Sequence, residues 1–119
     1  MAKFVLIDDS KVARSFLRNV LEEAGHEIVG EGVNGQEGLE LYNSLKPDII
    51  TLDVVMPIMT GMDCLQEIIK SDPAAKVIMI TSVGKDSLIQ KAKEMGAKAM
   101  IVKPINEEYV MEIVNSLLG

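Results

Sequence analysis

Five short segments rich in apolar residues, each too brief for a helix, recur along the 119-residue chain. They lie at residues 4–7, 27–30, 49–53, 77–80 and 99–102. Most of them lack polar alternation, which is typical of strands buried on both faces of a parallel sheet. After each segment, apolar residues recur at helical spacing, so that strands alternate with helices. The sequence therefore predicts an α/β fold, a doubly wound five-stranded parallel sheet with helices on both faces.

Helix boundaries follow from capping residues and helix breakers. Ser10 and Asn106 each precede a periodic apolar segment and are candidate N-caps. The first predicted helix ends before Gly25, and the second, at residues 36–45, is stopped by Pro47. The third and fourth helices are predicted at residues 62–70 and 87–95, and the last begins after Asn106. No linker, internal repeat or low-complexity segment interrupts the alternation, so we expect one domain over residues 1–119.

Charge and composition exclude several kinds of partner. The chain has 12 Lys and Arg against 18 Asp and Glu, a formal net charge of −6, so we expect no nucleic acid and no anionic membrane as partner. No apolar run approaches the roughly 20 residues of a membrane span, and Asp8 interrupts the N-terminus before a signal-peptide core develops. Cys64 is the single cysteine, which fits a reducing compartment. We therefore expect a cytoplasmic protein, and we expect it to be a monomer.

Polar side chains gather where the predicted strands end. These residues are Asp8 and Asp9 after the first strand, Asp53 at the end of the third, Thr81 and Ser82 after the fourth, and Lys103 after the fifth. Because the carboxyl ends of parallel strands share one edge of the sheet, we expect these side chains to meet there. Asp53 is the most informative of them, because it interrupts an apolar run and burial of an unpaired carboxylate is costly.

Three carboxylates at one edge predict a metal site. Two unit charges about 4 Å apart repel by roughly 4 kcal/mol at an effective dielectric constant near 20. A divalent cation relieves this repulsion, and oxygen ligands without histidine favour Mg²⁺, or Mn²⁺, over zinc. Phosphate chemistry follows, in which a carboxylate forms an aspartyl phosphate, a lysine neutralises its oxygens, and Thr81 or Ser82 donates to the third oxygen. Simpler roles stay open: Asp8 and Asp9 as helix caps, and Lys103 as a solvated charge at a strand end.

Over essentially its whole length the chain resembles the receiver domains of the two-component response-regulator family, and in its size the stand-alone chemotaxis regulators among them. The matching motifs are Ile7-Asp8-Asp9-Ser10, Leu52-Asp53-Val54-Val55-Met56-Pro57 with Gly61, Ile80-Thr81-Ser82, Gly96-Ala97 and Val102-Lys103-Pro104. The resemblance implies the flavodoxin-like strand order 2-1-3-4-5. It also implies a cis peptide bond before Pro104.

The resemblance further implies a role for each site residue. Asp53 would accept a phosphoryl group from a histidine kinase, and Lys103 would contact that group. The ligands of Mg²⁺ would be Asp8 through water, Asp9, Asp53 and the backbone carbonyl of Val55. Thr81 would move on activation and change the surface formed by the fourth helix, fifth strand and fifth helix, which would bind a target protein.

Two departures from the family pattern concern the response to phosphorylation. Met100 stands where relatives carry an aromatic residue coupled to the switch threonine, so a flexible thioether would have to move instead. Val55 is apolar where many relatives are polar, which leaves the lifetime of the phosphorylated state open. Tyr109, near the start of the last helix, is expected at the output surface.

Other functions fit parts of the sequence. Gly30-Glu31-Gly32-Val33-Asn34-Gly35 matches G-x-G-x-x-G, but Glu31 would face a pyrophosphate and five strands leave no second nucleotide-binding half, which argues against NAD. A haloacid-dehalogenase-like phosphatase also places Asp, Thr or Ser and Lys around Mg²⁺, but it needs a second Asp where Val55 stands. We therefore expect that the protein is not an enzyme, except that it catalyses its own phosphorylation and dephosphorylation. A chemotaxis role implies the flagellar motor switch as target, and a phosphorelay intermediate of the same fold stays open.

Overall fold

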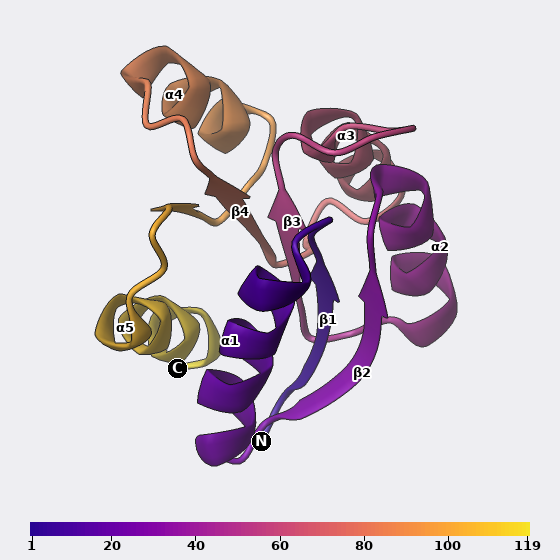
Figure 1. Cartoon of the computed structure of the whole chain (residues 1–119). Helices are drawn as coiled ribbons and strands as arrows, with labels where there is room; N and C mark the ends of the chain where they lie inside the picture. The colour runs from indigo at the N-terminus through magenta and orange to yellow at the C-terminus, as the bar shows by residue number, and fades with distance from the viewer.

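The computed structural model describes residues 1–119, whose strands form one parallel sheet. The strands are β1 (Lys3–Ile7), β2 (Glu27–Gly32), β3 (Ile49–Asp53), β4 (Val77–Thr81) and β5 (Ala99–Val102). They are ordered β2-β1-β3-β4-β5, and every neighbouring pair is parallel. The predicted doubly wound fold, with its flavodoxin-like strand order, is confirmed (Figure 1).

Helices cover both faces of the sheet, as Figure 1 shows. They are α1 (Lys11–Glu23), α2 (Gly35–Leu45), α3 (Gly61–Ser71), α4 (Asp86–Glu94) and α5 (Glu107–Leu118). Apolar side chains of α1 and α5 pack with Phe4 and Leu6 in one buried cluster. Those of α2, α3 and α4 pack with Val5 and Ile7 in the other. Successive residues of β1 belong alternately to the two clusters, because neighbouring side chains of a strand point to opposite faces of the sheet. Both faces of β1 are therefore buried.

Side-chain caps begin four of the helices. Ser10 and Asn106 each accept a hydrogen bond from the backbone N–H three residues further on, which confirms both predicted caps. Asn34 and Thr60 cap α2 and α3 in the same way. Helix α4 has no side-chain cap, and Ala92 is its one buried residue. It is therefore the helix that the core holds least firmly.

The largest difference from the predicted elements is at β2. This strand runs to Gly32, two residues beyond the predicted end, because its pairing with β1 continues to the last residue of that strand, Ile7. It lies at the edge of the sheet and only one of its six residues is buried, so apolar patterning marks its end poorly.

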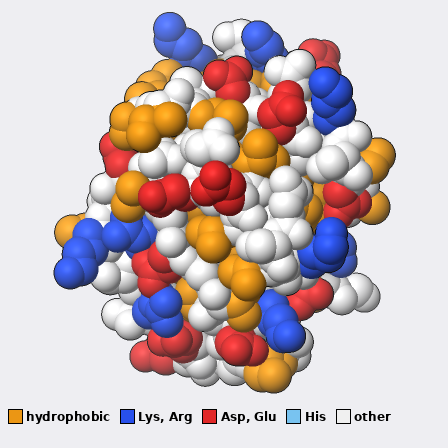
Figure 2. All heavy atoms as spheres, turned by 90° about the vertical axis from the view of Figure 1, so that its right-hand side faces the viewer, with side chains coloured by type: hydrophobic (Ala, Val, Ile, Leu, Met, Phe, Trp, Pro, Cys, Tyr) orange, Lys and Arg blue, Asp and Glu red, His pale blue; other side chains and the backbone are white.

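None of the helices combines the length and apolar character that a bilayer crossing requires. On the face at the right-hand side of Figure 1, acidic, basic and apolar side chains are interspersed, and no continuous basic stripe crosses this face (Figure 2).

Candidate functional site

The strand ends bring the predicted polar residues to one edge of the sheet. Asp53 is the last residue of β3 and pairs with Ile80, one residue before Thr81. Asp8 follows β1, which lies beside β3, and Lys103 follows β5, which lies beside β4. The Lys103–Pro104 peptide bond is cis, as the sequence resemblance implied. Side chains from three separate parts of the chain therefore meet at the carboxyl edge.

Asp8, Asp9 and Asp53 form an acidic cluster. Each offers a carboxylate oxygen, and these oxygens all lie within 4.8 Å of one another. Asp8 and Asp53 are only 2% and 7% exposed, whereas Asp9 is exposed. Charges at such separations repel by roughly 4 kcal/mol at an effective dielectric constant near 20. The cluster therefore requires positive charge, and burial of two of its members strengthens that requirement.

Lys103 supplies one positive charge to the cluster. Its Nζ lies 3.0 Å from Asp8 Oδ2 and 3.8 Å from Asp53 Oδ2. The contact with Asp8 is an ion pair without hydrogen-bond geometry, because Asp8 Oδ2 is buried and has no hydrogen-bond donor. One ammonium therefore lies beside two carboxylates of a cluster of three, and the Oδ2 oxygen of Asp8 is buried without a hydrogen bond.

Burial within the acidic cluster raises the pKa of Asp53 to about 6. Burial is the largest cause, the negative charge of Asp8 adds to it, and the positive charge of Lys103 partly offsets both. Ionisation of Asp53 is therefore costly, yet with a pKa of about 6 the group is mostly ionised at neutral pH. A carboxylate held in this state is a candidate nucleophile.

The donor set of the cluster suits a hard divalent cation. Its ligand atoms are carboxylate oxygens, and no histidine or cysteine belongs to the group. Oxygen-only sites favour Mg²⁺, Ca²⁺ or Mn²⁺ over zinc or copper. The carbonyl of Val55, in the exposed turn after β3, accepts no hydrogen bond within the protein and could add a ligand. The residues present therefore fit a cation, with the unsatisfied Asp8 oxygen as the most direct indication.

The loop after Asp53 is held by two glycines, which the sequence analysis did not single out as site residues. A Cβ at Gly61 would lie 2.0 Å from the backbone oxygen of Asp53, and one at Gly35 would lie 2.2 Å from that of Met59. Gly61 and Gly35 also donate backbone hydrogen bonds to Val54 and Met59. The first residues of α2 and α3 thus contact the loop that follows β3. These contacts fix the position of Asp53.

Ile58 lies in the same loop and has an unusual backbone conformation. Its φ is +70°, in the left-handed region, although it is a β-branched residue. Its side chain is 84% exposed, so packing does not offset the strain. No sequence pattern predicted this residue, because Ile carries no signal for a left-handed turn.

Of the predicted switch residues, Thr81 ends β4, Met100 is the second residue of β5, and Tyr109 lies in the first turn of α5. Thr81 is buried, and its hydroxyl accepts from the Val83 N–H at 2.9 Å and donates to the Val83 carbonyl at 3.3 Å. Met100 is buried in the core beneath α4. The Tyr109 hydroxyl donates to the Met100 carbonyl over 3.5 Å, and the Tyr109 side chain is partly exposed. Thr81 therefore points to its own turn in this structure.

The G-x-G-x-x-G segment has a packing explanation. A Cβ at Gly32 would lie 2.9 Å from an Ile7 methyl group, and Gly35 is needed for the contact described above. Glu31 forms ion pairs with Arg14 and Arg18. The glycines therefore serve close packing of β2 and α2, and the charged residue between them is used within the protein.

Comparison with known proteins agrees with this geometry. A family model described as the response regulator receiver domain matches residues 4–115. The chain is 43% identical to the chemotaxis protein CheY of Thermotoga maritima over 98% of both chains. It is 40% identical to the protein CcdB of Bacillus subtilis over 100% of this chain and 99% of that one.

Solved structures give the same result. The CheX-CheY-BeF3-Mg²⁺ complex of Borrelia burgdorferi contains a chain similar to this one, with a TM-score of 0.95 and 34% identity over 98% of this chain and 89% of that chain. The receiver motifs quoted from the sequence thus lie in a matching fold and along nearly the whole chain. The protein therefore belongs to the response regulator receiver domain family.

Proposed function

We propose that the chain is a phosphorylation-dependent signalling switch in which Asp53 accepts a phosphoryl group from a histidine kinase. The observation that carries the proposal is the acidic cluster, whose three carboxylates lie within 4.8 Å of one another beside the Lys103 ammonium. Similarity to chemotaxis proteins favours a role in chemotaxis. In that role the target would be the flagellar motor switch. A phosphorelay intermediate would use the same site and differ only in its partners.

Asp53 is the nucleophile of the proposed transfer. One of its oxygens attacks the phosphorus of a phosphohistidine donor, and the bond from phosphorus to the donor nitrogen breaks. The departing imidazole keeps the electron pair of that bond and takes up a proton. Lys103, whose Nζ lies 3.8 Å from Asp53 Oδ2, offsets negative charge on the transferred group.

Asp8, Asp9, Asp53 and the backbone carbonyl of Val55 would hold Mg²⁺, for which Mn²⁺ could substitute. When bound, the cation supplies positive charge to the phosphoryl oxygens. Support comes from the unsatisfied Asp8 oxygen and from the presence of a single ammonium, that of Lys103, beside a cluster of three carboxylates. The protein holds these oxygens close together before the cation binds. The stability of the rest of the fold offsets the repulsion between them.

The output would pass through α4, β5 and α5. A groove between these elements is lined by Ile89, Lys93, Met100, Val102, Tyr109 and Ile113. Helix α4 lacks a side-chain cap and buries one residue, so its position is easily shifted. Thr81 would leave its bonds with Val83 and turn to the phosphoryl group, and this movement would change the groove. Its occupant would be a segment of the target protein.

We infer that the chain catalyses only its own phosphorylation and dephosphorylation. A haloacid-dehalogenase-like phosphatase needs a carboxylic acid two residues after the nucleophile to protonate the leaving group. Val55 stands at that position and cannot donate a proton. Multiple turnover of p-nitrophenyl phosphate would contradict this inference and favour the phosphatase.

The test is labelling by a small phosphodonor. Acetyl phosphate with Mg²⁺ should add one phosphoryl group to the protein, measured by intact mass, and Asp53→Asn should add none. Asp63→Asn is the matched control, because Asp63 is an exposed aspartate in the first turn of α3, outside the cluster. Labelling of Asp53→Asn at the wild-type level would refute the assignment of the acceptor.

A second experiment concerns the coupling of phosphorylation to output. We expect Lys103→Ala to be labelled but to lose the gain in target affinity that phosphorylation gives, because the ammonium links the phosphoryl group to the end of β5. The target is captured by comparing pull-downs with the labelled and unlabelled wild-type protein. Equal target affinity of labelled Lys103→Ala and labelled wild type would contradict this role.

A further inference from the structure

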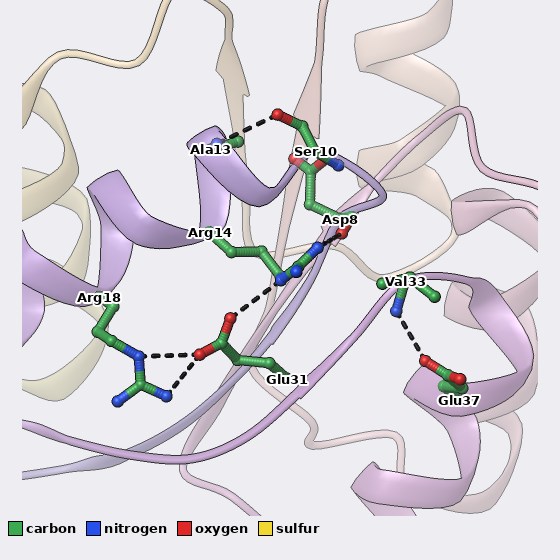
Figure 3. A network of polar contacts seen from close by, with 8 residues as sticks. All are labelled: Asp8, Ser10, Ala13, Arg14, Arg18, Glu31, Val33 and Glu37. Atoms are coloured by element: carbon green, nitrogen blue, oxygen red, sulfur yellow. Dashed lines mark hydrogen bonds and ion pairs between the residues drawn. The ribbon is translucent and has the colours of Figure 1, made fainter.

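Arg14 connects the acidic cluster to β2 through two charged hydrogen bonds. It lies in the first turn of α1, and its side chain is 14% exposed. Its Nε donates to Glu31 Oε1 at 2.9 Å, and its Nη1 donates to the backbone oxygen of Asp8 at 2.6 Å (Figure 3). One planar guanidinium therefore bridges an edge strand and the loop that carries the first aspartate of the cluster.

Asp8 is held at three of its four polar atoms. Its N–H donates to the Gly32 carbonyl at 3.1 Å, and its Oδ1 accepts from the Ser10 N–H at 2.8 Å. Its carbonyl accepts from Arg14, as described above. The fourth atom, Oδ2, is buried, has no hydrogen-bond donor and faces Lys103. The three bonds therefore leave Oδ2 as the one polar atom of Asp8 without a hydrogen bond.

Glu31 holds the guanidinium of Arg14 in place, and Arg18 in turn holds Glu31. Arg18 donates to Glu31 Oε2 from Nε at 2.8 Å, and Figure 3 shows it one turn further along α1. Burial raises the pKa of Glu31, but hydrogen bonds from Arg18 and Arg14 more than offset this effect and the pKa is lowered. Glu31 therefore stays ionised at neutral pH and keeps Arg14 directed at Asp8.

We propose that Arg14 is a positioning residue for the cation site, because it fixes the Asp8 main chain so that Asp8 Oδ2 points into the acidic cluster. The inference rests on the proposed function, since it assumes that the cluster binds a divalent cation. Arg18 makes a comparable ion pair with Glu31 but does not contact Asp8. The two arginines are therefore equivalent as links between α1 and β2, and only Arg14 reaches the site.

Positioning and simple electrostatics predict opposite effects on cation binding. If Arg14 acted only as a nearby positive charge, its removal would strengthen binding of Mg²⁺, because two cations repel. If it acted only on stability, the folded protein would bind Mg²⁺ as before. If it positions Asp8, its removal weakens binding, and loss of such an outer contact typically costs about tenfold or more in metal affinity. The sign of the change therefore separates the three roles.

The experiment measures Mg²⁺ affinity of the full chain by calorimetry for wild type, Arg14→Ala, Arg14→Lys and Arg18→Ala. We expect the dissociation constant of Arg14→Ala to rise about tenfold, and that of Arg18→Ala to change by less than about twofold. Arg14→Lys keeps the positive charge, but its single ammonium replaces a planar guanidinium that donates from two nitrogens at once. Its Mg²⁺ dissociation constant should therefore lie between those of wild type and Arg14→Ala. Thermal unfolding shows which fraction of each variant is folded.

A measurement on the wild-type protein keeps the test valid if Arg14→Ala does not fold. The chain contains only two arginines, Arg14 and Arg18, so their side-chain N–H signals in a nitrogen-15 spectrum are readily separated. Addition of MgCl₂ should shift the signal of Arg14 and leave that of Arg18 nearly unchanged.

The outcomes are distinct. Equal shifts of both signals, or an Arg14→Ala affinity equal to or higher than that of wild type, would overturn the positioning role while the proposed function stands. Absence of Mg²⁺ binding by wild type would overturn the cation site itself and the positioning role with it.

Discussion

Replacement of Asp53 by Asn should stabilise the protein in the absence of divalent cations. The ionised carboxylate is buried beside Asp8, and this environment raises its pKa from 3.8 to about 6. A carboxylate with a raised native pKa lowers stability once both states are ionised, because the unfolded chain loses its proton more readily. The amide of Asn has nearly the same shape and carries no charge, so the substitution removes this penalty.

The expected gain follows from the shift in pKa. Each pKa unit corresponds to about 1.36 kcal/mol, so the shift to about 6 predicts a gain of about 3 kcal/mol above pH 6. The penalty is absent well below pH 3.8, where Asp53 is protonated in both states, and it grows as pH rises from 3.8 to about 6. The difference between variant and wild type should therefore fall to about 0.5 kcal/mol at about pH 4.

Urea unfolding measures this difference. Wild type and Asp53→Asn are compared at about pH 7.5 and about pH 4, each with and without Mg²⁺. Saturating Mg²⁺ should close the gap at the higher pH, because the cation binds the wild-type cluster more tightly and stabilises it. Glu67→Gln, at an exposed position of α3, is the control and should change stability by less than about 0.5 kcal/mol. A destabilised Asp53→Asn without Mg²⁺ would refute the electrostatic argument.

Three further predictions follow from other parts of the structure. Ile58→Asn should stabilise the protein by about 0.5–1 kcal/mol in urea unfolding, because Asn tolerates the left-handed backbone at φ +70° and the lost side chain is exposed; a loss of stability would contradict this. Lys103→Ala should bind Mg²⁺ about three- to tenfold more tightly in calorimetry, because the Lys103 ammonium competes with Mg²⁺ for the carboxylates of Asp8 and Asp53. Weaker binding would show that no such competition exists. His26 accepts the Ala2 N–H at 3.0 Å, and burial, with the N-terminal charge, lowers its pKa below 6.5. Its contribution to stability is complete well above pH 6.5 and is lost as pH falls from 6.5 through the lowered native pKa. His26→Gln should therefore lose less stability than wild type between about pH 7.5 and pH 5, and equal losses would refute the assignment.

The positions of the site residues followed from the sequence because strand ends are local features. Asp53 ends an apolar run and Lys103 follows another, and parallel topology brings all such ends to one edge. The strand order itself rested on the family resemblance, since five strand-helix units with short loops allow several orders. The end of β2 was misplaced because an edge strand shows weak apolar patterning.

Side-chain directions could not be predicted, because they depend on contacts between distant segments. The pairing of Lys103 with Asp8, and the bonds of Thr81 with its own turn, arise from how loops close after the strands end. The sequence partly indicated the position of Arg14, because Arg14 lies one turn beyond the cap Ser10 and its neighbours in the helix are apolar or small. Its partner Glu31 was singled out only as an obstacle to pyrophosphate, and the link between the two required the structure.

The most direct test of the account locates the phosphoryl group. After reaction with acetyl phosphate, borohydride reduces an aspartyl phosphate to homoserine, and peptide mass spectrometry identifies the reduced residue. The account predicts reduction at Asp53 alone, and only when Mg²⁺ or Mn²⁺ is present during labelling. Reduction at Asp8 or Asp9, or equal labelling of Asp53 after chelation of divalent cations, would contradict it.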